Sequence, residues 1–123
     1  LKAPSQGWIM GDSHMLWMVV ENLVSNGIKY TPPGGVVNVR LVRRANRWVL
    51  TVKDTGVGIA KKDFPKLFKQ FSRITNARSD FVTGTGVGLY LAYHLTILHG
   101  GSVGVVSTKN KGSTFTVRLP RKL

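Results

Sequence analysis

Three polar side chains between residues 21 and 30 share one face of a predicted helix. Asn22, Asn26 and Lys29 lie at positions i, i+4 and i+7, and residues at this spacing are neighbours on a helix surface. Two carboxamides and an ammonium group suit a metal–triphosphate, because Mg²⁺ takes hard oxygen ligands and usually binds phosphate oxygens as well. A solvated polar face has the same composition, so the spacing alone is weakly specific.

Asp54 stands where a charge is unexpected. It continues the apolar face formed by Trp48, Leu50 and Val52, and the two-residue period of a strand then points its carboxylate toward the helix layer, where a charge needs a partner. Gly56 and Gly58 leave room for a flat group to approach the backbone. The exocyclic amine of an adenine would donate to the carboxylate. The alternative is a turn-closing role, because Asp-Thr-Gly is a good turn sequence.

Three alternate glycines, Gly84, Gly86 and Gly88, precede another predicted helix. Backbone amides in a glycine-rich segment and at a helix N-terminus suit phosphate. The segment is not a P-loop, because no Gly-Lys-Ser/Thr follows, and it is not the dinucleotide fingerprint, because it follows a long loop and not a strand. By itself it is weak support for a phosphate site, since flexible turns look the same.

The elements that must position these residues can be predicted from periodicity. A helix is expected from Asp12 or Ser13 to about Tyr30, with an apolar stripe that comprises Leu16, Val20, Leu23 and Gly27. The sequence TPPGG at residues 31–35 ends it. A short helix is expected over residues 61–71, and another over residues 87–99 ends at the two glycines 100–101. A long polar loop is expected over residues 72–86, and such a loop is uncommon in a compact domain and often functional.

Two hairpins complete the predicted fold. Alternating side chains predict strands over residues 37–42 and 48–53, joined by a turn at 44–47, and over residues 102–107 and 113–119, joined around Lys109 to Gly112. The fold class is therefore α+β: a two-layer sandwich in which about three helices cover one face of a mixed, mainly antiparallel sheet.

Composition limits the possible partners. The chain has 123 residues, which fits one domain, and no cysteine, which excludes disulfides and thiolate metal sites. Its net charge of +13 favours anionic partners, namely a nucleotide, a nucleic acid or an acidic protein face. A solvated basic surface explains most of these charges. No nucleic acid is expected, because the cations are not interleaved with exposed aromatic residues. No membrane contact is expected, because no apolar run reaches about 18–20 residues.

Four segments in a fixed order together resemble a known family. They resemble the N, G1, F and G2 boxes of the catalytic and ATP-binding domain of sensor histidine kinases, in the GHKL superfamily with the Bergerat ATP-binding fold. The segments are ENLVSNGIKY at 21–30, DTGVGIA at 54–60, LFKQFSR at 67–73 and GTGVGLYLA at 84–92. The resemblance covers residues 10–120, nearly the whole chain, and the segment ENLxxNxxKYT is specific as a whole.

The resemblance implies the cofactors ATP and Mg²⁺ and a role for each matching residue. Asn26 would coordinate Mg²⁺, supported by Asn22, while Lys29 contacts phosphate and Tyr30 packs on the nucleotide. Arg73 joins Asn22, Asn26 and Lys29 in the catalytic set. The remaining nucleotide-binding residues would be Asp54, Gly56, Gly58, Ile59, Phe71, Arg78, Gly84, Thr85, Gly86, Val87, Gly88, Leu89 and Thr114. Residues 72–86 would form a mobile ATP lid, tethered by Phe68 and Phe71.

One departure from the wider superfamily bears on the reaction. The GHKL hydrolases have a water-activating Glu four residues before the metal-binding Asn, whereas this chain has Asn22 there. An amide cannot accept a proton from water. Glu21 is rotated about 100° round the helix, so it should point elsewhere. This favours phosphoryl transfer to an external acceptor over hydrolysis. A second departure is Gly27, where the family usually has Ala.

The acceptor is not expected in this chain. None of His14, His94 and His99 has a phosphoacceptor context or metal-ligand spacing. The expected partners are therefore the helical dimerisation and histidine phosphotransfer domain of the same kinase and the receiver domain of a response regulator. The chain is expected to be a monomeric fragment of a larger kinase, on the cytoplasmic side of a membrane to which the parent could be anchored.

Three other functions remain open from the sequence. The first is an ATP-gated clamp or hydrolase of the gyrase type, which steady ATP hydrolysis by the domain would favour. The second is a binding module, either a degenerate kinase that holds nucleotide without transfer or a basic nucleic-acid binder with salt-dependent binding. The third is the related protein-serine kinase of the anti-sigma type.

Overall fold

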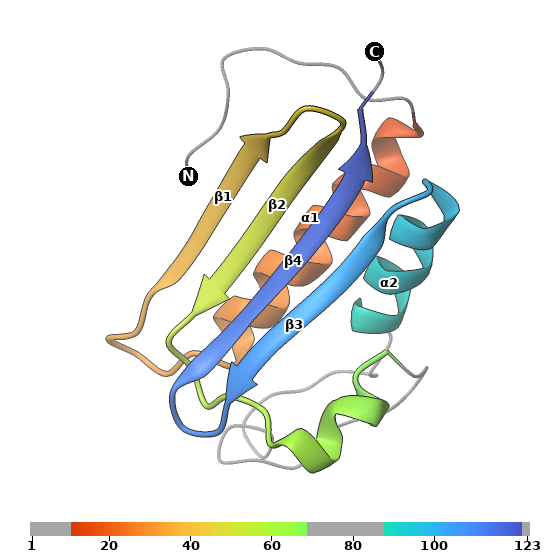
Figure 1. Ribbon diagram of the computed structural model, residues 1–123. Helices are drawn as coiled ribbons and strands as arrows, with labels where there is room; N and C mark the ends of the chain where they lie inside the picture. The colour runs from red at the N-terminus through yellow and green to blue at the C-terminus, as the bar shows by residue number, and fades with distance from the viewer. Residues whose placement is uncertain (1–10, 69–87, 122–123) are drawn as a thin grey trace.

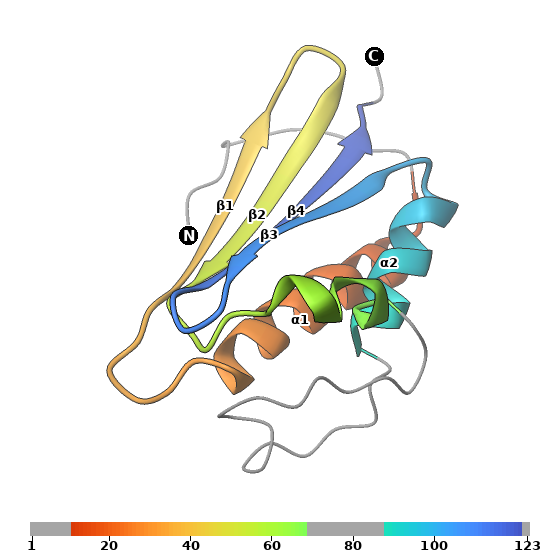
Figure 2. The same ribbon diagram turned by 60° about the horizontal axis from the view of Figure 1, so that its bottom comes forward.

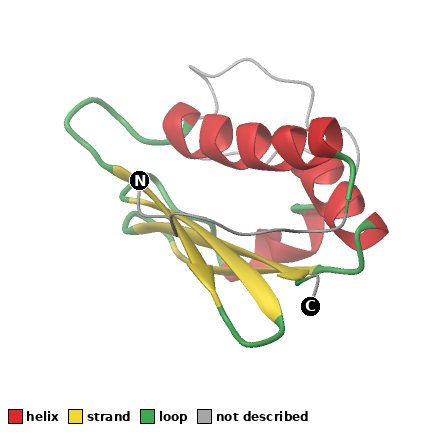
Figure 3. Ribbon diagram, turned by 90° about the horizontal axis from the view of Figure 1, so that it is seen from above, coloured by secondary structure: helices red, strands yellow, loops and turns green. Residues whose placement is uncertain are grey.

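The computed structural model of the chain describes residues 11–68 and 88–121. In this part of the chain a four-stranded sheet forms one layer and the helices form the other, which confirms the predicted two-layer α+β fold. The helices are α1 (Ser13–Lys29), the 3₁₀-helix η1 (Lys61–Lys66) and α2 (Gly88–Leu98). All three lie on the same side of the sheet (Figures 1 and 3).

The sheet has the order β1-β2-β4-β3 and is antiparallel at every described pairing. Its strands are β1 (Val37–Arg43), β2 (Arg47–Asp54), β3 (Ser102–Thr108) and β4 (Gly112–Pro120). Both predicted hairpins are present, and β2 and β4 join them at the centre of the sheet (Figure 1). At one end of that central pair, Asp54 lies opposite Ser113.

Helix α1 begins and ends where its capping residues predict. The Asp12 carboxylate accepts a hydrogen bond from the Met15 amide at 2.9 Å, which satisfies one of the free N–H groups of the first turn. The buried side of α1 comprises Val19, Leu23 and Gly27. The prediction that Val20 belongs to this stripe was wrong, because Val20 is 39% exposed. Both valines satisfy an i+3 or i+4 spacing from Leu16, and contact with the sheet selects Val19.

The core lies between the sheet and the two long helices. Its buried residues are Val19, Leu23, Leu50, Val52, Ala92, Phe115 and Val117. Phe68 closes the core near η1, where its ring stacks on Tyr93 at 4.9 Å and meets Phe115 edge-on at 6.4 Å. The short helix predicted over residues 61–71 is a 3₁₀-helix as far as Lys66, and Pro65 within it lacks the amide that a regular α-helix would use.

A histidine ties the two long helices together at one end. The Asp12 amide, at the start of α1, donates to His99 Nε2 at 3.1 Å. His99 Nδ1 lies 2.8 Å from the Leu95 carbonyl oxygen, so the proton belongs on Nδ1. His99 therefore has a structural role. In the described ranges, no helix combines the length and the apolar character that crossing a membrane requires.

Candidate functional site

The predicted site residues gather where three segments meet: the C-terminal half of α1, the loop after β2 and the first turn of α2. The carbonyl oxygen of Tyr30, at the end of α1, accepts a hydrogen bond from the Val57 amide at 3.2 Å. At α2, a Cβ atom placed on Gly88 would lie 3.3 Å from Asn22 Oδ1. The loop after β2 therefore lies beside the end of α1 on the helix side of the sheet (Figure 2).

Asp54 is buried at the end of β2, with 6% of its surface exposed. Its Oδ1 atom accepts two backbone hydrogen bonds, from Gly56 at 2.8 Å and from Ser113 at 3.3 Å. Among the described residues, no cation pairs with this carboxylate and both of its hydrogen bonds are made by Oδ1. Burial raises the pKa of Asp54, and the two amides offset part of that rise. The two amides thus fix the orientation of the carboxylate through Oδ1.

Close backbone packing explains the glycines of this loop. A Cβ atom on Gly56 would collide with the Tyr30 carbonyl oxygen and lie 2.8 Å from Asp54 Oδ1. Gly58 has a φ of 67° and its backbone lies against the Thr108 carbonyl group. Larger side chains at these two positions would separate α1 and the second hairpin from the loop. The loop therefore forms a narrow floor beside Asp54 that a flat group could approach.

Two serines that the sequence did not single out hold this floor in place. Ser107 on β3 accepts a hydrogen bond from the Ile59 amide at 2.8 Å, and its hydroxyl lies 2.7 Å from Ser113 Oγ. Ser113 in turn presents its amide to Asp54. The alternation of residues in β4 could have indicated Ser113, because Ser113 faces the same side of the sheet as the buried Phe115 and Val117.

Helix α1 presents its predicted polar face at the edge of the site. Asn22, Asn26 and Tyr30 are half-buried, whereas Lys29 is exposed. The N-terminus of α2, which begins at Gly88, lies next to Asn22. Within the described part of the chain, no three His, Cys, Asp or Glu side chains gather as metal ligands. A metal here would therefore depend on amide oxygens and on oxygens of a ligand, which is a donor set that fits Mg²⁺.

Some of the residues predicted for the nucleotide site do not lie with the others around Asp54. Thr114 is in register with Lys53 and Val106, which places it on the opposite face of the sheet from Asp54. Ile59 and Leu89 pack against the hydrophobic core, so their side chains support the site from behind. Seven predicted residues lie outside the described ranges: Phe71, Arg73, Arg78, Gly84, Thr85, Gly86 and Val87.

Comparison with known proteins identifies the family. Residues 11–123 match the family described as "Histidine kinase-, DNA gyrase B-, and HSP90-like ATPase". The chain therefore belongs to this family, and the predicted resemblance is confirmed.

The individual relatives are sensor kinases. Sensor histidine kinase RppB of Synechocystis sp. is 41% identical over 89% of this chain and 24% of that protein. Sensor-like histidine kinase SenX3 of Mycolicibacterium smegmatis is 39% identical over 96% of this chain and 31% of that protein. This chain thus spans about a quarter to a third of the length of these two relatives.

Solved structures show the same fold. The mycobacterial sensor histidine kinase MprB superposes with a TM-score of 0.80 at 29% identity, over 93% of this chain and 75% of that chain. Full-length ShkA in complex with AMPPNP also gives a TM-score of 0.80, at 26% identity, over 96% of this chain and 24% of that chain. The structural similarity therefore agrees with the family found from the sequence.

Proposed function

We propose that this domain binds Mg-ATP beside Asp54 and donates the γ-phosphate to a histidine on a separate helical dimerisation domain, in two-component signal transduction. The observation that carries the proposal is the buried Asp54 carboxylate, which is oriented by two backbone amides and has no cationic partner among the described residues. Burial of a carboxylate costs free energy unless hydrogen-bond donors compensate for the lost water. The exocyclic amine of adenine supplies one, and the family supplies the expectation of ATP.

The residues around Asp54 would then act by position and charge. Gly56 and Gly58 would let the base lie against the loop, while Tyr30 packs on the nucleotide. Lys29 would contact phosphate, and Asn26, supported by Asn22, would hold Mg²⁺. Mg²⁺, when bound, would neutralise charge on the phosphates. Arg73 and Arg78, outside the described ranges, would approach the terminal phosphate and offset charge in transfer.

Asn22 supports transfer over hydrolysis. Its carboxamide lies beside the first turn of α2 and cannot serve as a general base toward water. We therefore propose a separate dimerisation domain as the immediate phosphate acceptor and a response-regulator receiver domain as the next one. The domain would work on the cytoplasmic side of the membrane.

ATP binding by the native chain and by Asp54→Asn tests the nucleotide site. The substituted amide keeps the shape of the side chain but turns an acceptor toward the adenine amine into a donor. Calorimetry with and without Mg²⁺ should show binding that weakens roughly 10- to 100-fold in Asp54→Asn, the range expected for a hydrogen bond to a charged group. Equal affinity of the two proteins would refute the site. Steady ATP hydrolysis by the native chain would refute transfer in favour of a hydrolase.

A further inference from the structure

The face of the sheet opposite the helices is strongly cationic. Strand alternation places Arg40 on β1, Arg47 and Lys53 on β2, and Arg118 on β4 on this outer face, together with Thr51, Thr114 and Thr116. No described helix or strand covers it (Figure 3). We call the surface formed by Arg40, Arg47, Lys53 and Arg118 the basic sheet face.

No carboxylate balances this charge within the described residues. Asp12 and Glu21 belong to the start and middle of α1, Asp63 to η1, and Asp54 to the buried side of β2. Among the described residues, an ion pair joins Lys66 and Asp63 on the helix side of the sheet. An ordinary solvated surface mixes charges of both signs. The basic sheet face therefore differs from an ordinary solvated face, because its charged side chains are all positive.

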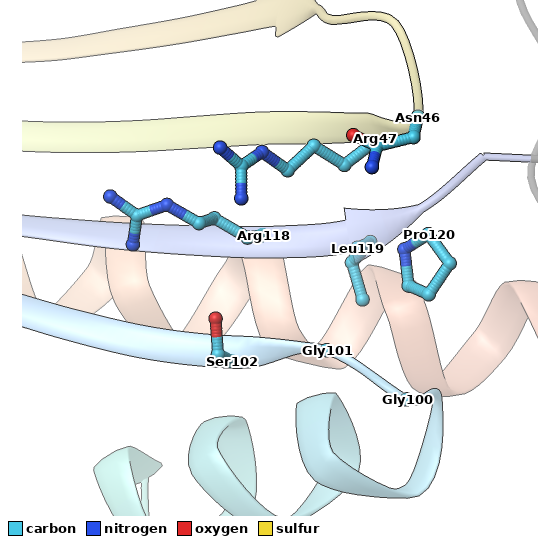
Figure 4. Close-up of a pocket in the computed structure, with 8 residues that line it drawn as sticks. All are labelled: Asn46, Arg47, Gly100, Gly101, Ser102, Arg118, Leu119 and Pro120. Carbon is cyan, nitrogen blue, oxygen red and sulfur yellow. The ribbon is translucent and has the colours of Figure 1, made fainter.

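Arg47 and Arg118 are the focus of this surface. They are diagonal neighbours on adjacent strands, since Arg118 lies opposite Val49, and their side chains run side by side along β2 and β4 (Figure 4). Arg118 Nη1 lies over β3, where a Cβ atom on Gly104 would be 3.5 Å away. Two parallel guanidinium groups repel one another and present several donors in one direction, which suits paired carboxylates.

An open pocket adjoins the two arginines. Its volume is about 310 Å³, and it is lined by Asn46, Arg47, Gly100, Gly101, Ser102, Arg118, Leu119 and Pro120 (Figure 4). The Arg121 guanidinium is held elsewhere, because its Nη1 atom donates to the carbonyl oxygens of Arg44 and Ala45 at 2.7 and 3.1 Å and the group lies over the Trp48 ring. The pocket lies across the sheet from Asp54, so it is separate from the candidate nucleotide site.

We propose that the basic sheet face docks a protein segment rich in Asp and Glu, whose carboxylates bind Arg47 and Arg118 and then extend toward Arg40 and Lys53. Charge complementarity selects this partner. A nucleic acid fits less well, since the described outer-face residues include no aromatic side chain on which a base could stack. The proposal is independent of the ATP site.

Fluorescence anisotropy with a labelled poly-glutamate peptide tests the proposal. The Arg47→Gln/Arg118→Gln variant should bind the peptide roughly tenfold more weakly than the native chain, as expected when two charge-assisted contacts are lost. Lys61→Gln/Lys62→Gln is the matched control, because it removes the same charge from exposed residues of η1. It should lose about twofold or less, through long-range attraction only. Calorimetry should give unchanged ATP affinity for both variants, which also verifies that they fold.

Four outcomes would overturn the proposal. Equal losses in the two double variants would reduce the effect to net charge. Absence of peptide binding to the native chain at low salt would remove the docking surface altogether. Tighter binding of a single-stranded DNA oligonucleotide, lost in Arg47→Gln/Arg118→Gln, would assign the surface to nucleic acid. Displacement of the peptide by ATP would show that the peptide occupies the nucleotide site instead.

Discussion

Asp54 shows how a binding residue can oppose the stability of the fold that holds it. Burial raises the pKa of this carboxyl group, and the hydrogen bonds from Gly56 and Ser113 lower it by less. The folded state therefore binds the Asp54 proton more tightly than the unfolded chain does. It follows that the ionised group costs stability near neutral pH, although binding an adenine amine needs the ionised form.

A pH series can measure this cost. As the pH falls through the raised pKa of Asp54, the native chain should gain unfolding free energy relative to Asp54→Asn, and the gain should level off below the ordinary aspartate pKa of 3.8. Urea denaturation of both proteins at each pH gives the difference, and the comparison cancels the titration of all other groups. A constant difference across the series would contradict the raised pKa. ATP affinity of the native chain should fall over the same interval.

At the scale of the helix, Gly27 lowers the helix propensity of α1 but leaves room for the side chains of the sheet. A glycine within a helix costs about 1 kcal/mol relative to alanine. A Cβ atom at this position would lie 3.3 Å from Val37 Cγ1 and 3.7 Å from Val52 Cγ1. Val37 begins the edge strand β1 and is only half-buried, so it can move by the few tenths of an ångström that the first contact requires.

Gly27→Ala should therefore stabilise the domain by roughly 0.5–1 kcal/mol, most of the gain in helix propensity. Urea unfolding would measure it as a higher midpoint with an unchanged slope. Gly27→Val is the control, because its extra methyl groups meet the same two valines and its β-branch is disfavoured in a helix, so this variant should be less stable than Gly27→Ala. A lower urea midpoint for Gly27→Ala than for the native chain would mean that Val37 on β1 cannot move to accommodate the new Cβ atom.

The elements were predictable where one local pattern decides their orientation. Alternation from Trp48 to Val52 was enough to direct Asp54 inward. Along α1 the pattern was ambiguous, since Val19 and Val20 both fit the helical period, and only the sheet could decide. Ser107 and Ser113 were missed because their contact depends on the register between β3 and β4, which no short segment encodes. Thr114 was assigned to the site although its alternation with Phe115 pointed away from it.

Charge is distributed very unevenly over the whole molecule. The net charge is +13, and the described carboxylates lie at the N-cap of α1, on α1, on η1 or buried at the end of β2. Self-repulsion of this kind destabilises a compact state, and salt screens it over about 10 Å at 0.1 M.

The melting temperature should accordingly rise with sodium chloride between low and physiological ionic strength. About 4 °C is expected for each 1 kcal/mol of relieved repulsion in a domain of this size. Differential scanning calorimetry would measure the slope, and Arg47→Gln/Arg118→Gln should show a smaller one because it carries less charge. A melting temperature that stays flat or falls with salt would mean that repulsion does not limit stability.

The position of β4 has a consequence for biosynthesis. The strand nearest the C-terminus lies at the centre of the sheet, between β2 and β3, and it brings Ser113 to Asp54 across 59 residues of sequence. While a ribosome is still making residues 112–120, one edge of β2 and both edges of β3 are unpaired in the nascent chain, and such edges promote aggregation. The domain can close, and acquire its Asp54 site, only when nearly the whole segment has emerged.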